Sequence, residues 1–251
     1  MSSHHPFRHR EAAAPLLSAF CAGLGLLALG ANAQTEEASA LGLSGSAALT
    51  SDYVWRGSSQ TQGDAAVQAG FKAAHRSGVY ASVWGSNVEF APGTHASSEF
   101  DFSVGWAGKI ARDWSLDVNL LHYRYPSTTA DLNWTELNGT LTWRDDYWLS
   151  LAYSNLALGS RDRGLYAQLG ARFPVNDAIR FEAAVGHYVL DDVYDRSYSH
   201  GQLSAIWTAK TASSANLELR LTAHATDRSA ERIFGDALAG SRIEAAVQAS
   251  F

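Results

Sequence analysis

Two pairs of residues in this chain have the types and spacing for nucleophilic chemistry. His75 and Ser77 stand two positions apart, as do His95 and Ser97, so both side chains of a pair would share one face of an extended strand. Such a histidine could act as general base for a serine nucleophile in a hydrolase. No third residue that would orient either histidine can be named from the sequence. Both pairs also lie in or beside predicted connections, which argues against a catalytic site. We therefore predict no catalytic residue, and a hydrolase is the weakest of the alternative functions.

The sequence gives metal binding little more support than it gives nucleophilic catalysis. Asp191, Asp192 and Asp195 gather in the stretch LDDVYDRSYS, but their spacing matches no dedicated calcium loop. The remaining histidines, His122, His187, His200 and His224, lack metal-ligand spacing. We predict no metal and no cofactor, and we interpret the acidic stretch as a solvated loop. Divalent-cation binding among lipopolysaccharide phosphates is left as the alternative.

Charged side chains that alternate with apolar ones suggest a third kind of function, selective passage of solutes through a polar conduit. Arg180 and Glu182, for example, alternate with Ile179, Phe181 and Val185. If the apolar sets face lipid, the interior receives Asp52, Arg56, Lys72, Glu99, Asp101, Asp117, Glu136, Arg172, Arg180, Glu182, Glu218, Arg220, Arg242 and Glu244. These residues would either set the selectivity of a pore or form cross-strand ion pairs that fill and stiffen a barrel.

The elements that must position these residues are strands. From Leu43 onward, stretches of about ten residues alternate apolar and polar side chains between short clusters of Gly, Asp, Asn, Ser or Pro. We count twelve such stretches: 43–56, 65–74, 79–89, 98–110, 114–125, 132–143, 147–157, 164–173, 179–189, 198–208, 216–226 and 241–251. This pattern fits a soluble β-sandwich or barrel as well as an outer-membrane barrel, which places its apolar face outside.

Connection lengths and aromatic residues favour the membrane barrel. Tight connections such as ARD and RDD alternate with mostly longer ones, as periplasmic turns alternate with external loops. Aromatic residues near the tight connections and chain end predict one membrane-interface girdle: Trp106, Trp114, Trp143, Tyr147, Trp148, Phe173, Phe181, Trp207 and Phe251. A second girdle is predicted from Tyr53, Trp55, Tyr123, Tyr125, Trp134 and Tyr188.

Both chain ends agree with export and membrane insertion. Residues 1–33 combine basic residues, an apolar core and a small-x-small site ending at Ala33, which predicts a cleaved secretory signal peptide. Its removal takes away Cys21, the only cysteine. The chain ends GSRIEAAVQASF, an amphipathic strand that would pair with the first strand and close the barrel. A C-terminal aromatic residue such as Phe251 is also what the outer-membrane assembly machinery favours.

The stretches SDYVWRGSSQT, AVQAGF, GVYASVWGSNVEF and YRYP resemble the signature of the TorF-type porin family (Gcw_chp), small proteobacterial outer-membrane proteins. Ser82 stands where that family is expected to have glycine. The resemblance implies location and fold more than activity, and it supplies no catalytic residues.

We therefore predict an all-β protein: a transmembrane up-and-down antiparallel β-barrel of about twelve strands in a Gram-negative outer membrane. The predicted organisation is signal peptide 1–33, short segment 34–42 and barrel 43–251. The predicted function is passive diffusion of small hydrophilic solutes or ions, and the alternative is a non-conducting structural or docking barrel. Expected partners are outer-membrane lipid, lipopolysaccharide, the assembly machinery and small solutes. Nucleic acid is not expected, because the net charge is -6 and no basic run occurs.

Overall fold

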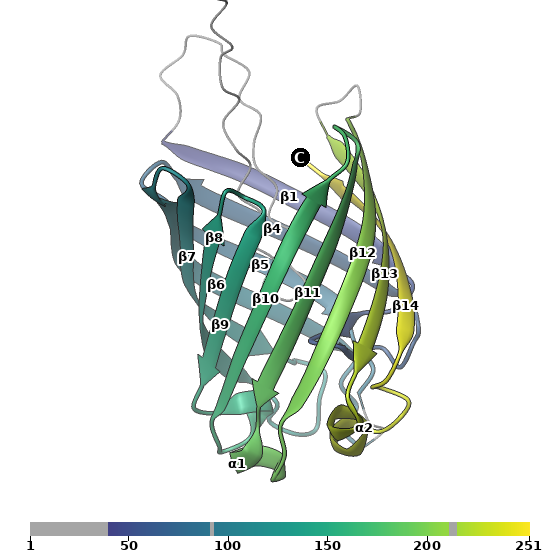
Figure 1. Ribbon diagram of the computed structural model, residues 1–251. Coiled ribbons are helices and arrows are strands. Elements are labelled where there is room, and N and C mark those ends of the chain that lie inside the picture. Colours follow the sequence, from purple (N-terminus) through teal and green to yellow (C-terminus); the bar gives the residue numbers. More distant parts are fainter. Residues whose placement is uncertain (1–39, 91–92, 211–214) are drawn as a thin grey trace, which may run out of the picture.

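Twelve antiparallel strands form a closed barrel (Figure 1) in the computed structural model, which describes residues 40–90, 93–210 and 215–251. Each barrel strand pairs with the next one along the chain, and the first pairs with the last. The structure confirms the predicted up-and-down, almost all-β barrel. The predicted signal peptide lies outside the described residues.

The barrel strands have clear bounds. They are β1 (Leu41–Thr50), β4 (Ala66–His75), β5 (Val79–Asn87), β6 (Ser98–Ala111), β7 (Trp114–Arg124), β8 (Trp134–Trp143), β9 (Tyr147–Ser154), β10 (Gly164–Pro174), β11 (Ile179–Val189), β12 (Tyr198–Lys210), β13 (Asn216–Thr226) and β14 (Arg242–Ser250). The predicted first strand, 43–56, is wrong at its end. After Thr50 the chain turns inward and forms a small hairpin from β2 (Val54–Trp55) and β3 (Ser58–Ser59).

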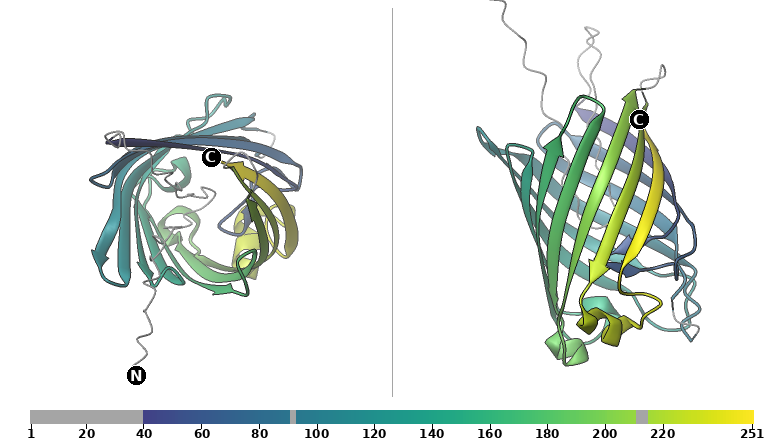
Figure 2. Two further views of the ribbon diagram at one scale, coloured as in Figure 1. Left: turned by 90° about the horizontal axis from the view of Figure 1, so that it is seen from above. Right: turned by 45° about the vertical axis from the view of Figure 1, so that its right-hand side comes forward.

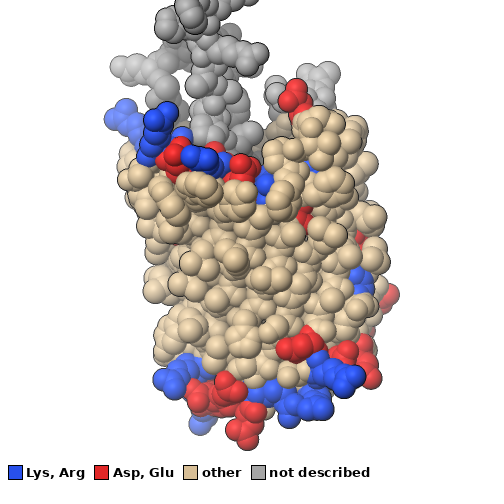
Figure 3. Space-filling model, viewed as in Figure 1, with Lys and Arg blue, Asp and Glu red and all other residues tan. Residues whose placement is uncertain are grey.

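Side chains alternate between the two faces of the barrel wall along most of each strand. Along β9, Leu149 and Leu151 are exposed on the outside, whereas Ser150 and Ser154 are buried inside. On the face drawn in Figure 3, Lys, Arg, Asp and Glu gather at the two ends of the barrel, and the band between them is almost free of charge. A closed ladder that satisfies its own backbone groups, wrapped in an apolar band, is the form in which β-structure crosses a bilayer.

The two ends of the barrel differ in their connections. One end, here called the turn end, carries the tight turns 76–78, 112–113 and 144–146 and the C-terminus. The other, the loop end, carries longer connections, including a 3-10 turn (Ala157–Gly159), α1 (Asp191–Tyr194) and α2 (Arg228–Phe234), which lie at the bottom of Figure 1. The side chain of Asp227 caps α2 by accepting hydrogen bonds from the backbone N–H groups of Ser229 and Ala230. No helix in the described ranges is long and apolar enough to cross a membrane.

The last residue of the chain takes part in closure. Phe251 exchanges two backbone hydrogen bonds with Gly45, at 2.8 and 3.0 Å, next to the Ser46–Ser250 pair that joins β1 to β14. The Phe251 ring lies across Gly45, where an added Cβ would come within 2.6 Å of its Cζ atom. This contact explains why an exposed aromatic residue ends the strand. Figure 2 shows the ring of strands viewed along the barrel and the C-terminus at the turn end.

Candidate functional site

The first connection at the loop end folds into the barrel. We call residues 51–65 the crossing hairpin. Val54 pairs with Ser59 and Trp55 with Ser58, so that Arg56 and Gly57 form a two-residue turn. Both turn residues have positive φ, 47° and 82°, as a type I′ turn requires. A Cβ at Gly57 would lie 2.6 Å from the Cβ of His200 on β12, so only glycine fits this close approach to the far wall.

Asp52 holds the base of the crossing hairpin. One carboxylate oxygen accepts hydrogen bonds from the hydroxyls of Ser59 and Thr61, at 2.6 and 3.1 Å. The other accepts from a guanidinium nitrogen of Arg242 on β14, at 3.0 Å. The hydroxyl of Thr61 also accepts from the backbone N–H of Tyr53, at 3.1 Å. These contacts explain the pattern SDYVWRGSSQT, because its polar residues fold the hairpin and anchor it to the seam between β1 and β14.

Arg56, at the hairpin tip, forms a buried ion pair with Glu136 of β8. Two guanidinium nitrogens donate to the two carboxylate oxygens at 2.9 and 2.8 Å, and both side chains are almost completely buried. The guanidinium carbon lies 4.0 to 4.7 Å from the ring centroids of Trp55, Tyr166 and Tyr188. An arginine guanidinium is not deprotonated in proteins, and here its two donor nitrogens face the carboxylate of Glu136. Arg56 therefore remains charged inside the barrel.

Aromatic residues surround this ion pair and fill the loop half of the lumen. Trp55 meets Tyr123, Trp134 and Tyr188 edge to face at centroid distances of 6.0 to 6.2 Å, and Tyr123 stacks on Trp134 at 4.3 Å. The predicted second girdle is therefore wrong, because all six of its aromatic residues are buried inside the barrel. Strand parity explains the error: Tyr123 shares a face with Asp117, and Trp134 with Glu136, which were themselves expected to point inward.

A second charged layer lies toward the turn end, on β10 to β13. Glu182 accepts from Arg172, Arg180 and Arg220 at 3.0 to 3.2 Å, and Glu218 accepts from Arg180 and Arg220 at 2.6 and 2.8 Å. The five side chains thus form one connected network. Sequence parity places them on one face, but the register between strands determines which charges meet.

The other predicted lumen residues also point inward, and several have partners. The ammonium group of Lys72 lies 3.7 Å from the centroid of the Tyr80 ring, and the Tyr80 hydroxyl donates to Asp117 at 2.8 Å. The hydroxyl of Tyr125 donates to Glu99 at 2.7 Å, and Asp101 lies buried on the same face of β6. Glu244 accepts from Thr50 at 2.8 Å and contacts His224 at 2.9 Å.

A polar cavity of about 110 Å³ lies between the crossing hairpin and the second charged layer. It can hold several water molecules, because one water needs roughly 10–15 Å³ of such space. Its lining includes four glutamines, Gln68, Gln168, Gln202 and Gln248, together with the small residues Ala48 and Ala246. The sequence analysis considered charged residues only and missed these amides. Their parity with Lys72, Arg172 and Glu244 is the signal that could have found them.

The predicted membrane-interface aromatics lie on the outer surface, with one exception. Trp114, Tyr147, Phe173, Phe181, Trp207 and Phe251 are exposed, and Trp106 and Trp143 are partly so. Trp148 is only 5% exposed and points inward, where its indole N–H donates to Gln168 at 3.1 Å. Because Tyr147 and Trp148 are neighbours on one strand, they must face opposite sides, so placing both in the girdle was wrong.

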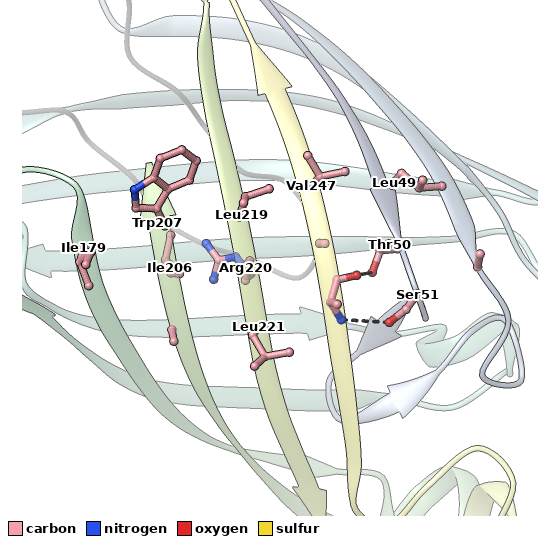
Figure 4. Close-up of a pocket in the computed structure, with 14 residues that line it drawn as sticks. Leu49, Thr50, Ser51, Ile179, Ile206, Trp207, Leu219, Arg220, Leu221 and Val247 are labelled. Carbon is pink, nitrogen blue, oxygen red and sulfur yellow. Dashed lines mark hydrogen bonds between the residues drawn. The ribbon is translucent and has the colours of Figure 1, made fainter. Parts of the chain in front are cut away.

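The outer wall is hollowed beside the closing seam (Figure 4). Leu49, Trp207, Leu219, Leu221 and Val247 surround a shallow apolar groove over β1 and β12 to β14. At its edge the backbone N–H of Ala245 donates to the hydroxyl of Ser51 at 2.9 Å, which extends the seam beyond the end of β1.

Neither of the two His-x-Ser pairs considered in the sequence forms a triad. The Nδ1 atom of His75 lies 2.8 Å from the hydroxyl of Ser77, but the pair sits in an exposed turn and, in the described part of the chain, no carboxylate hydrogen-bonds to His75. His95 lies in a loop with positive φ. In the acidic loop, Asp192 pairs with Arg163 and Asp191 accepts from Ser197. The described residues contain no cluster of His, Cys, Asp and Glu suited to a metal ion.

A closed twelve-stranded barrel with an apolar outer wall and a charged interior defines the class of this protein, a transmembrane β-barrel. Residues 34–246 match the model of the Gcw_chp family, described as "bacterial protein of unknown function", and the chain belongs to that family. A search of curated proteins found no sequence that matches this chain.

Solved structures show the same fold at low sequence identity. The NanC porin superposes with a TM-score of 0.51 and 13% identity, over 84% of this chain and 99% of that one. The KdgM porin in complex with disordered oligogalacturonate superposes with a TM-score of 0.50 and 7% identity, over 83% of this chain and 97% of that one. At these identities the likeness concerns the fold.

Proposed function

We propose that this protein is a narrow outer-membrane channel for passive diffusion of small hydrophilic solutes, with the predicted lumen residues along the solute path. The observation that carries the proposal is the polar cavity inside a porin-type barrel, between the crossing hairpin and the second charged layer. A fully structural barrel has no need of a polar space lined by Gln68, Gln202 and Gln248, whose side chains make no hydrogen bond within the described chain. Diffusion through a lumen requires no chemistry on the solute, so the proposal is not enzymatic.

The crossing hairpin is the constriction of this channel. Its tip reaches from β1 to contacts on β8, β10, β11 and β12, and it brings the bulk of Trp55 and Arg56 to the middle of the lumen. A non-conducting barrel is the second candidate. The crossing hairpin favours it, because Arg56 at the hairpin tip and its partner Glu136 are almost completely buried and block the lumen at that level. The two candidates differ in whether the hairpin leaves or opens a path for ions.

The same proposal includes the route to the membrane and the contacts made there. We infer that residues 1–33 form a cleaved signal peptide for export, residues 34–42 a short segment and residues 43–251 the barrel. The loop end would face the outside, where lipopolysaccharide surrounds it, and the closing strand with Phe251 would be read by the assembly machinery. The TorF-type porin label is part of this proposal.

Planar-bilayer recording tests the channel directly. Purified protein, shown to be folded by its different gel mobility before and after boiling, should give discrete conductance steps. The conductance should be small, because the hairpin and the paired charges occupy most of the lumen. Folded protein that stays silent over many insertions would reject the channel and leave the structural barrel. Liposomes that contain the protein and are loaded with sugars of increasing size should show a sharp upper size limit for sugar release.

A further inference from the structure

We propose that the polar cavity is a binding site for an uncharged, hydroxyl-rich solute, a sugar or polyol. This inference rests on the proposed channel function and names its solute class. The cavity lies inside the barrel against β1, β4, β10 and β12 to β14, and it is covered on the loop side by Tyr53, Val54 and Arg56.

Each charged side chain in the cavity lining already has an ion-pair or hydrogen-bond partner. Its lining holds two arginines, Arg56 and Arg220, and two glutamates, Glu218 and Glu244. Arg56 is paired with Glu136, Arg220 with Glu182 and Glu218, and Glu244 with Thr50 and His224. A charged solute would enter without a free counter-charge and would lose its hydration, which is costly in a confined space. The cavity therefore disfavours anions and cations alike.

The unpaired groups that face the cavity are amides. Gln68, Gln202 and Gln248 are partly exposed inside the barrel, and within the described chain no hydrogen bond to their side chains is found. Each amide offers a donor and an acceptor, which match the donor and acceptor of a hydroxyl group. An apolar solute would leave these amides without partners, which is unfavourable.

The strand register spaces two of these amides across a small residue. Ala48 on β1 stands directly opposite Gln68 on β4 and directly opposite Gln248 on β14. Since neighbouring strands lie about 4.7–4.9 Å apart, the two glutamine backbones are about 10 Å apart, with only a methyl group between them. A sugar ring over Ala48 could hydrogen-bond to both amides. The rings of Tyr53 and Tyr166, also in the lining, supply the apolar surface typical of ligand pockets.

Binding can be measured separately from conduction. The purified barrel in detergent micelles is titrated with glucose, followed by calorimetry and by intrinsic tryptophan fluorescence. Trp148, which hydrogen-bonds to Gln168 at the cavity, contributes to that signal. Gluconate and glucosamine serve as charged probes of similar size. We expect saturable glucose binding, with both charged probes at least tenfold weaker. Gln68→Leu and Gln248→Leu should each weaken glucose binding roughly fivefold, because each loses about one net hydrogen bond.

Two further variants keep the test sharp. Arg161→Leu is the control, since Arg161 is exposed in the connection between β9 and β10, outside both the crossing hairpin and the cavity lining, and it should bind glucose like the wild type. Ala48→Val leaves both amides in place but fills the space between them, and it should also weaken binding. The heat-dependent gel shift shows whether each variant is folded. If Gln68→Leu fails this check, Gln68→Asn takes its place.

The outcomes separate the two proposals. Conductance steps without saturable glucose binding would overturn the sugar site and leave the channel. Glucose binding in micelles with silent bilayers would overturn the channel and leave the site. Tighter binding of gluconate or glucosamine than of glucose, or unchanged binding in Gln68→Leu and Gln248→Leu, would overturn the assignment of an uncharged solute to these amides.

Discussion

Replacing Arg56 by alanine should release the crossing hairpin from the lumen. The substitution removes both hydrogen bonds to Glu136 and the contacts with three aromatic rings, and it leaves a carboxylate that is about 1% exposed without its cation. Breaking a buried ion pair on one side costs about 3–5 kcal/mol. Arg56 already has positive φ, so alanine adds no backbone strain that arginine lacks. The energy is large enough to displace a loop.

Two measurements report this change. The temperature at which the compact gel form disappears should fall in Arg56→Ala, and single-channel conductance should rise because the hairpin no longer crosses the lumen. Arg163→Ala is the control, because its ion pair with Asp192 is mostly exposed and worth only about 0.2–1 kcal/mol. Arg56→Met combined with Glu136→Leu should recover much of the lost stability, since an apolar pair can replace a buried ion pair.

The reasoning fails if Arg56→Ala behaves like Arg163→Ala in both measurements. It also fails if the double variant is less stable than Arg56→Ala alone. The first result would mean that the ion pair does not hold the hairpin, and the second that Glu136 is not penalised by losing its partner.

Three other predictions test the wall, the closure and the second charged layer. Leu203→Arg should lower the yield of folded protein in lipid-refolding assays far more than Gln202→Arg. Leu203 is 57% exposed on the lipid side, where arginine costs about 2–4 kcal/mol near the midplane, whereas the neighbouring Gln202 points inward. Equal yields of the two variants would mean that the faces are reversed. Phe251→Asp and Gly45→Val should both lower outer-membrane abundance on immunoblots of membrane fractions, because each removes the ring-on-glycine contact at the closing seam, and normal abundance of both would contradict that role. Arg180→Glu combined with Arg220→Glu should destabilise the barrel at neutral pH, because the new glutamates would face Glu182 and Glu218. The loss of stability should be smaller in acid, where carboxylates are protonated. A stable variant whose ion selectivity alone shifts toward cations would instead indicate an open, hydrated pore.

The sequence alone determined the strands and their faces. A period of two residues is a local property, so it can be read without knowing which strands are neighbours. It placed Arg180, Glu182, Glu218 and Arg220 on the inner face, and it required Tyr147 and Trp148 to face opposite sides, although the prediction overlooked that consequence. The amphipathic closing strand before Phe251 could also be recognised from the sequence, because a barrel cannot leave an edge unpaired.

Only the tertiary structure decided what fills the barrel. The contact between Arg56 and Glu136 joins residues 80 positions apart, and nothing in local alternation indicates that residues 51–65 turn inward rather than outward. The inward-facing Tyr123 and Trp134 are a different case, because their parity with Asp117 and Glu136 could have been read from the sequence. The pairing of charges and the spacing of Gln68 and Gln248 across Ala48 depend on strand register, which is fixed by the closure of the whole barrel and not by any single strand.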